Sequence, residues 1–246
     1  MIKKGLSLVI PAHNAAHVIE QSVREYYNLF HQSFEPFEII VVCNACSDNT
    51  AVIAGQLAKN FPLDVLDIPQ RGKGNALIKG FVKAKYGIMG FLDVDNPFEP
   101  ARILEMARSV QRNYCDVAIA TKYLQGAMKG KRGIRDSNMR RLVALGGQAF
   151  AWLLFGLKFR DTQAGAKFFS HTVWESIDKH FICIGFDFDI EFLYKVMKKD
   201  FTVAEFYTPL FKYERFSTVR LKYVAGMIYR LVKFRFYTHE KNTSHF

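Results

Sequence analysis

Long hydrophobic runs are missing from this chain of 246 residues. The longest apolar stretch, residues 146–157, is interrupted by Gln148 and followed at once by Lys158, so it is too short to span a bilayer. We expect it to form a core helix instead. The apolar run near the N-terminus is short and ends at Pro11, which predicts that the chain carries no secretion signal.

Cysteine is also scarce, with four residues in the whole chain. Without an export signal, so few cysteines argue against a disulfide framework and predict a reducing, cytoplasmic location. Cys43 and Cys46 have the spacing of half a zinc site, but no second pair of cysteines or histidines accompanies them, so we expect no zinc. Internal repeats and low-complexity tracts are absent as well, which argues against a repeat architecture.

Acidic residues are outnumbered by basic ones, 23 against 34, which gives a net charge of +11 and a pI near 9.5. Such a balance favours a polyanionic partner, which is a nucleic acid, an anionic lipid or a phosphorylated substrate. The chain has no recognisable nucleic-acid-binding module, and its basic residues cluster beside carboxylate motifs. We therefore expect no nucleic-acid partner.

Short β-branched runs alternate with segments of helical periodicity along the first half of the chain. The pattern predicts strands at residues 6–10, 38–43, 63–68, 88–92 and 117–121. It predicts helices at residues 16–30, 48–60 and 100–113, and another from the Gly72-Lys73-Gly74 turn to about Lys85. This alternation is typical of an α/β, Rossmann-like fold, in which a mostly parallel sheet is flanked by helices and ligands bind beyond the carboxyl ends of the strands.

Two polar motifs follow predicted strands. Asp93-Val94-Asp95 comes directly after the strand at 88–92, where two carboxylates can hold Mg²⁺ or Mn²⁺ against a diphosphate. An isolated motif of this kind is more often a solvated turn that caps the next helix. The second motif, the glycine-relaxed loop from Arg71 to Asn75, opens a helix. Its backbone N–H groups, the helix dipole and Lys73 are expected to face a phosphate.

A series of ordered motifs resembles those of family 2 glycosyltransferases over residues 6–213. The first three are the strand and turn at 7–14, the glycine-relaxed loop and the Asp-x-Asp motif. Further on, residues 160–167 (RDTQAGAK) resemble the Asp-Thr-Gln-x-Gly-x-Lys signature of dolichyl-phosphate β-glucosyltransferases, and residues 188–191 (FDIE) resemble their Phe-Asp-x-Glu element. Dolichyl-phosphate mannose synthases are close cousins. The resemblance implies a GT-A fold in a single domain of two halves.

The resemblance also implies site roles. Asp95 is the expected metal ligand, Asp93 contacts the nucleotide sugar and Lys73 lies near the diphosphate. The nucleotide pocket includes Pro11 and Asn14, with Asn44 in place of the usual aspartate. The remaining implied residues line the donor sugar or acceptor phosphate, or lie on the helix below the acceptor: Asp161, Gln163, Lys167, Asp189 and Glu191. Pro97 departs from relatives that place a glutamine there as another metal ligand.

The expected organisation is a nucleotide-sugar-binding half at 1–121, an acceptor-binding half at 122–215 and a basic amphipathic helix and tail at 216–246. A basic loop at 122–141 lies at the boundary, and five of its cations are candidates for binding the acceptor phosphate: Lys122, Lys131, Arg132, Arg135 and Arg141. The last helix carries an apolar stripe, which either contacts a lipid surface or packs on the core. The sequence is consistent with both interpretations. The stripe consists of Val224, Met227, Ile228, Leu231 and Phe234.

These features predict an inverting hexosyltransferase that uses UDP-glucose, or next GDP-mannose, with a polyprenyl phosphate acceptor at the cytoplasmic membrane face. A phosphate acceptor is already anionic, so no strong protein base is required. One alternative is transfer to a glycan hydroxyl with Asp189 or Glu191 as base. Another is a catalytically silent relative, suggested by Cys43, Asn44 and Pro97.

Overall fold

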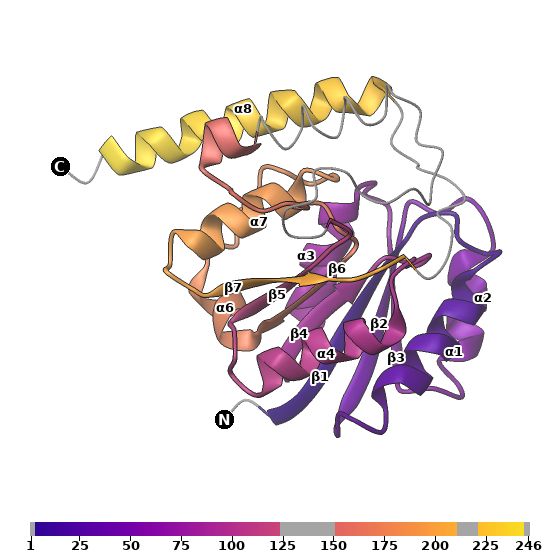
Figure 1. Cartoon of the computed structure of the whole chain (residues 1–246). Coiled ribbons are helices and arrows are strands. Elements are labelled where there is room, and N and C mark those ends of the chain that lie inside the picture. Colours follow the sequence, from indigo (N-terminus) through magenta and orange to yellow (C-terminus); the bar gives the residue numbers. More distant parts are fainter. Residues whose placement is uncertain (1–2, 124–150, 211–220, 244–246) are drawn as a thin grey trace.

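The computed structural model of the chain describes residues 3–123, 151–210 and 221–243, drawn in colour in Figure 1. Its central feature is a seven-stranded sheet with the order β3-β2-β1-β4-β6-β5-β7. The strands are β1 (Lys3–Ala12), β2 (Phe37–Asn44), β3 (Leu63–Ile68), β4 (Tyr86–Leu92), β5 (Val117–Thr121), β6 (Ala166–Ser170) and β7 (Val203–Tyr207). The helices are α1 (Ile19–Phe30), α2 (Thr50–Leu57), α3 (Lys73–Lys83), α4 (Pro100–Gln111), α6 (His171–Ser176), α7 (Phe188–Met197) and α8 (Leu221–Thr243).

The sheet is mostly parallel, as the alternation of strands and helices predicts. β1 pairs in parallel with both β2 and β4, β2 pairs in parallel with β3, and β5 pairs in parallel with β7. The exception is β6, which is antiparallel to both of its neighbours, β4 and β5. The sequence pattern did not predict β6 or β7. The carboxyl ends of β1, β2 and β4 all meet at one edge, so the motifs that follow them are brought together.

Helices cover both faces of the sheet (Figure 1). One buried cluster joins α1, α2 and α4 to one face, with side chains such as Ile19, Leu57 and Met106. The other cluster joins α3, α6, α7 and α8 to the opposite face. All eight residues of β2 are buried, because this strand is covered from both sides. Close packing requires Gly80 in α3, since a Cβ there would lie 2.4 Å from a methyl group of Val9.

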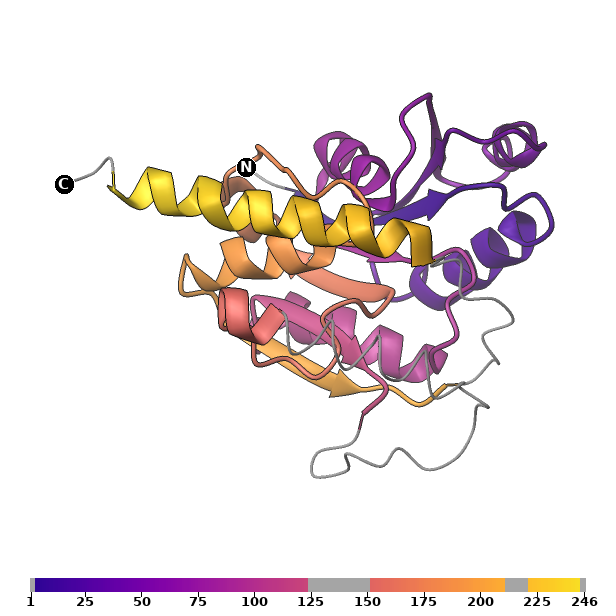
Figure 2. The same cartoon turned by 90° about the horizontal axis from the view of Figure 1, so that it is seen from above.

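Helix α8 lies across the α3 and α7 side of the molecule, and its C-terminal end projects beyond the sheet (Figures 1 and 2). Of the predicted apolar stripe, Leu231 and Phe234 are buried in the core, where Phe234 stacks on Phe155. Ile228 is 45% exposed, so the stripe is not buried against the core along its whole length. Across the described residues, no helix combines the length and apolar character needed to cross a membrane.

Of the stretch predicted to be a core helix at 146–157, the structure describes residues 151–157, and these are only partly buried. The structure describes a helical turn at 151–155, in which Ala151 and Phe155 are buried. In contrast, Trp152 is 53% exposed and Leu153 is 75% exposed. Apolar composition alone does not place a helix inside the core. In this helical turn, one face packs against neighbouring side chains and the other face is exposed to solvent.

Candidate active site

Asp93 follows β4 directly and is held from three directions. Its backbone N–H donates to the carbonyl of Gly165 at 2.8 Å, and its own carbonyl accepts from the hydroxyl of Tyr26 at 2.6 Å. Its side-chain Oδ1 lies 2.9 Å from Nζ of Lys73. The neighbouring carbonyl of Val94 accepts from the hydroxyl of Ser22. Helix α1 therefore fixes the Asp-x-Asp turn from below, a role that the sequence pattern did not reveal.

A buried charged cluster extends from Asp93 into the protein. Asp189, at the start of α7, has its Oδ1 2.7 Å from Nζ of Lys167 and its Oδ2 3.6 Å from Nζ of Lys73. The two ammonium groups lie over the ring of Phe91, at 5.2 Å and 4.8 Å from its centroid. Two of these ionic side chains, Lys167 and Asp189, are almost completely buried. The structure thus brings together four residues that the motifs had pointed to separately.

The two lysines respond to this environment in opposite directions. Burial alone would lower the pKa of Lys73, but the carboxylates of Asp189 and Asp93 outweigh it and raise that pKa above its ordinary value. Burial lowers the pKa of Lys167, and the carboxylate of Asp189 offsets this only in part. Lys73 is therefore the firmly charged member of the cluster, which suits a group expected to lie near a diphosphate.

Asn44, at the end of β2, connects two loops of the site. Its Nδ2 donates to the carbonyl of Ala12 at 2.9 Å, and its Oδ1 accepts from the backbone N–H of Gly72 at 3.2 Å. The side chain is buried, and through these two contacts it positions the glycine-relaxed loop. Asn14 is exposed, adopts a left-handed φ of 50° and accepts from the N–H of Ser47 at 2.8 Å.

The segment 182–187 packs directly on the glycine-relaxed loop. The carbonyls of Gly185 and Ile184 accept from the N–H groups of Gly74 and Asn75, at 3.2 Å and 3.1 Å. A Cβ on Gly72 would lie 2.3 Å from the carbonyl oxygen of Ile184, which explains the glycine. These two N–H groups are therefore occupied by the protein itself, which corrects the expectation that they face a phosphate.

Two further carboxylates near α7 are buried and paired. Asp187 lies 2.6 Å from Nε of Arg230 on α8. Glu191 lies 2.8 Å from Nζ of Lys195, and its other oxygen accepts from the N–H groups of Ile182 and Cys183 at 2.9 Å and 2.7 Å. Both carboxylates are fully buried. They organise the segment 182–187 and are turned away from solvent.

The other predicted residues lie around this cluster. Asp95 is exposed beside Asp93, Pro11 is buried at the end of β1, and Asp161 is partly exposed. Gln163 is exposed and donates to the carbonyl of Phe186 at 2.8 Å. Lys122 is partly exposed just beyond β5. The remaining cations of the basic loop lie outside the described residues: Lys129, Lys131, Arg132, Arg135, Arg140 and Arg141.

Comparison with known proteins decides the family. The model of Glycosyl transferase family 2 matches residues 7–177 of the chain. The chain belongs to this family. The family 2 match covers β1 to α6 and so includes the Asp-x-Asp turn and Lys167.

Three curated relatives of this family 2 chain each share less than 30% of their aligned residues with it. Glycosyltransferase AglD of Haloferax volcanii is 28% identical over 82% of this chain and 32% of its own length. Dolichyl-phosphate beta-glucosyltransferase of Dictyostelium discoideum is 23% identical over 81% of this chain and 64% of its own length. Dolichol-phosphate mannosyltransferase of Pyrococcus furiosus is 27% identical over 49% and 34%. The chain thus spans less than two thirds of each of these relatives.

Solved structures establish the fold as GT-A. Glucosyl-3-phosphoglycerate synthase from Mycobacterium tuberculosis, in complex with Mn²⁺, UDP and glucosyl-3-phosphoglycerate, superimposes with a TM-score of 0.67 at 18% identity. The alignment covers 93% of this chain and 77% of that one. TarS from S. aureus gives a TM-score of 0.55 at 16% identity, over 82% and 57% of the two chains. At these identities the likeness concerns the fold alone.

The donor set of this family 2 site suits a hard divalent cation. Asp93 and Asp95 offer carboxylate oxygens at the carboxyl end of β4, and Asp95 is exposed to an incoming ligand. Within the described ranges, no three His, Cys, Asp or Glu side chains gather at one point. Mg²⁺ commonly takes only one or two carboxylates from the protein and completes its shell with substrate phosphates and water. The residues present therefore fit a metal that binds together with a diphosphate.

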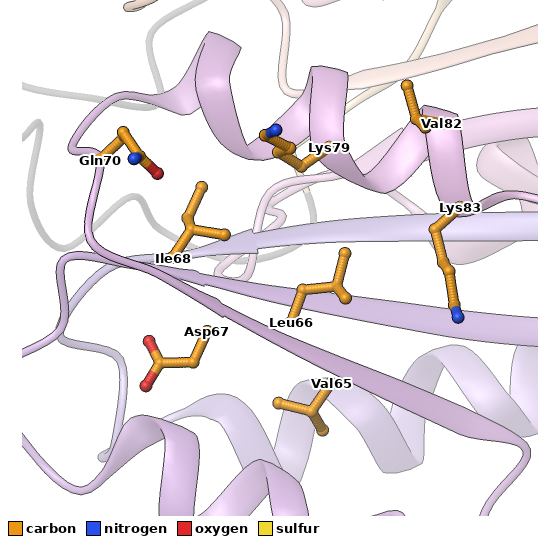
Figure 3. Close-up of a pocket in the computed structure, with 8 residues that line it drawn as sticks. All are labelled: Val65, Leu66, Asp67, Ile68, Gln70, Lys79, Val82 and Lys83. Atoms are coloured by element: carbon orange, nitrogen blue, oxygen red, sulfur yellow. The ribbon is translucent and has the colours of Figure 1, made fainter.

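A separate hollow of about 480 Å³ lies between the edge strand β3 and α3 (Figure 3). It is lined by Val65, Leu66, Asp67, Ile68, Gln70, Lys79, Val82 and Lys83. None of the charged cluster residues lines it. We therefore locate the family 2 site at the carboxyl ends of β1, β2 and β4, and not in this hollow.

Gly165 provides a direct test of how Asp93 is held. A Cβ at this position would lie 2.1 Å from Oδ2 of Asp93, so an alanine forces that carboxylate away from Lys73. We expect Gly165→Ala to lower kcat/KM for glycosyl transfer by about 100-fold, as small misplacements in active sites do. Gly55→Ala is the matched control, because a Cβ there meets nothing within 4 Å. Equal activities of the two variants would show that the Asp93 side-chain position is unimportant.

Proposed function

We propose that this chain transfers a hexosyl group from a nucleoside diphosphate sugar to a polyprenyl phosphate, with inversion at the anomeric carbon. One observation carries the choice of acceptor. The three carboxylates at the start of α7, Asp187, Asp189 and Glu191, are buried, and each is paired with a cation of the chain. A hydroxyl acceptor needs a base to remove its proton, whereas a phosphate acceptor is already anionic.

The buried pairs weigh against the hydroxyl alternative in a specific way. Asp189 and Glu191 were the candidate bases, and a base must come within about 3.2 Å of the proton that it removes. To reach a hydroxyl in the open site, Asp189 would have to leave Lys167 and abandon a buried ion pair. The names of the Dictyostelium and Pyrococcus relatives, which refer to dolichyl phosphate, also support a prenyl phosphate acceptor.

On the donor side, Asp95 would hold Mg²⁺ or Mn²⁺, which would neutralise charge on the departing nucleoside diphosphate, and Asp93 would contact the nucleotide sugar. Lys73 would stabilise the same diphosphate, since its ammonium lies 2.9 Å from Asp93 and is firmly protonated. Pro11 and Asn14 would border the nucleotide. The Asp-Thr-Gln pattern at 161–163 favours UDP-glucose, with GDP-mannose next.

On the acceptor side, Lys122 and loop cations such as Arg132 and Arg135 would bind the acceptor phosphate through charge-assisted hydrogen bonds. Asp161 and Gln163 would border the sugar as it is transferred. Lys167 would act from below by neutralising Asp189, with which it is in direct contact. In-line attack by a phosphate oxygen on the face opposite the leaving diphosphate inverts the anomeric centre.

Contact with a membrane would occur through α8. Its outward side carries Ile228, Tyr229 and Phe236, of which the last two are each 68% exposed. Aromatic and basic side chains on one helix suit the headgroup region of a bilayer. A prenyl acceptor is embedded in lipid, so the enzyme must approach it there, and we propose peripheral attachment to the cytoplasmic face.

The function is tested by incubating the purified chain with Mn²⁺, a short polyprenyl phosphate and a panel of nucleotide sugars. We expect a hexosyl-prenyl phosphate to appear by mass spectrometry, with UDP-glucose as the best donor. NMR of the anomeric proton should show a configuration opposite to that of the donor. Nucleotide-sugar binding without any product would instead identify a silent relative. Product only on hydroxyl acceptors would overturn the proposal.

A further inference from the structure

The ion pair between Asp187 and Arg230 joins α8 to the segment 182–187. Arg230 reaches the carboxylate with two nitrogens, Nε at 2.6 Å from Oδ2 and Nη2 at 3.0 Å from Oδ1. The same Oδ1 accepts from the backbone N–H of Gly185 at 3.0 Å. A two-point contact of this kind fixes the orientation of the guanidinium relative to the carboxylate as well as the distance between them. The carboxylate of Asp187 therefore holds α8 and the turn at Gly185 in one defined geometry.

Segment 182–187 in turn contacts both sides of the active site. Towards the donor side, its Ile184 and Gly185 carbonyls accept from the N–H groups at the start of α3, next to Lys73. Towards the motif at residues 160–167, its Phe186 carbonyl accepts from the side chain of Gln163. A shift of this segment would thus move the residues on either side of Lys73 and release Gln163.

The geometry of α8 makes Arg230 suited to this task. Leu231 and Phe234 anchor the helix in the core, and Phe234 meets Tyr194 of α7 edge to face at 5.5 Å. Arg230 lies on the same side of the helix, next to Leu231. A Cβ on Gly185 would lie 2.9 Å from Nη2 of Arg230, so the contact is tight. The carboxylate of Asp187 is buried while the side chain of Arg230 is 28% exposed, so Arg230 holds this carboxylate from the surface side.

We propose that Arg230 is a positioning residue, which acts through Asp187 to hold segment 182–187 against the glycine-relaxed loop and so fixes the donor side of the site. The tail helix α8 is then part of the catalytic unit and not only a surface element. This inference depends on the family 2 site and not on the identity of the acceptor.

The test is amide hydrogen exchange on the full chain, which requires neither donor nor acceptor. In Arg230→Ala we expect roughly tenfold faster exchange in peptides covering 72–76 and 182–187, while peptides from β1 and β2 keep the wild-type rate. Arg230→Lys should be intermediate, because lysine keeps the charge but loses the fork. Lys233→Ala is the matched control, since Lys233 is an exposed cation on the same helix.

A second readout separates positioning from general stability. Calorimetry with Mn²⁺ and whichever of UDP and GDP binds the wild type should give a roughly tenfold weaker affinity for Arg230→Ala. Asp187→Asn combined with Arg230→Ala should be no weaker than Arg230→Ala alone, since both act on one contact. Unchanged exchange at 72–76 and 182–187, or an equal increase throughout the chain, would overturn the proposal. A failure of the prenyl phosphate assay would leave these results unaffected.

Discussion

Asp95→Ala is expected to lower glycosyl transfer by about 1,000-fold, the scale seen when electrostatic stabilisation of a leaving group is removed. Asp95 is exposed beside Asp93 at the carboxyl end of β4, and it is the residue that we assign as metal ligand. The affinity for nucleotide in Mn²⁺ should fall with the rate, because metal and diphosphate bind together. Initial rates of lipid product formation, followed by mass spectrometry, measure the effect.

The control for Asp95→Ala is Asp64→Asn, which changes an aspartate at the opposite end of the sheet. Asp64 lies at the start of β3, where its partner is Lys85 at 3.3 Å. We expect this variant to retain wild-type activity. If Asp95→Ala were as active as Asp64→Asn, the Asp-x-Asp turn would be a solvated turn and not a metal site.

The second large effect concerns stability. Asp189→Ala removes the carboxylate paired with the ammonium of Lys167, which is 0% exposed and keeps a hydrogen bond to the carbonyl of Ala164 at 2.9 Å. Removing one partner of a buried ion pair costs about 3–5 kcal/mol, so we expect the free energy of unfolding to fall by that amount. Urea denaturation monitored by circular dichroism measures it, since the midpoint shifts while the slope stays constant.

A double variant distinguishes an unpaired charge from a packing defect. In Lys167→Met combined with Asp189→Leu, both charges are replaced by apolar side chains of similar size. We expect this protein to recover most of the stability that Asp189→Ala loses, because Lys73 keeps its ion pair with Asp93 and no unpaired ammonium of Lys167 remains. Equal instability of the single and double variants would mean that packing, and not charge, dominates at this position.

Sequence patterns identified the first half of the fold well. The strands at 63–68 and 117–121 were predicted with the bounds that the structure has, and α4 begins at Pro100 as expected. In this half β1 to β4 are each followed by a helix and pair with one another in parallel, so local periodicity and topology agree. For the stretch at 146–157, of which the structure describes 151–157, Ala151 and Phe155 join the core as predicted, but composition did not reveal that Trp152 and Leu153 face solvent.

The second half depends on contacts between distant residues. β6 is short and contains Lys167, a residue type that is rarely buried, so nothing local marked it as a central strand. Its burial depends on Asp189, which lies 22 positions further along the chain. Only the resemblance to known motifs linked these two residues before the structure brought them together.

Some site contacts left weak traces in the sequence. Arg230 occurs at helical spacing from Met227 and Phe234, and a cation inside an apolar stripe signals a buried partner. That signal identifies Arg230 but not Asp187. Tyr26 lies at helical spacing from the other buried residues of α1, yet its hydroxyl contact with Asp93 depends on the tertiary fold. Asn44 keeps the position of the family aspartate, but its side chain hydrogen-bonds to the loops at Ala12 and Gly72.

The most direct test of the proposed reaction compares two acceptors that differ in one group. A short polyprenyl phosphate and the matching polyprenol are each supplied with Mn²⁺ and the same nucleotide sugar. We expect a hexosyl product on the phosphate and none on the alcohol, because the buried carboxylates of Asp187, Asp189 and Glu191 are each committed to an ion pair. Transfer to the alcohol at a rate equal to that on the phosphate would contradict this expectation.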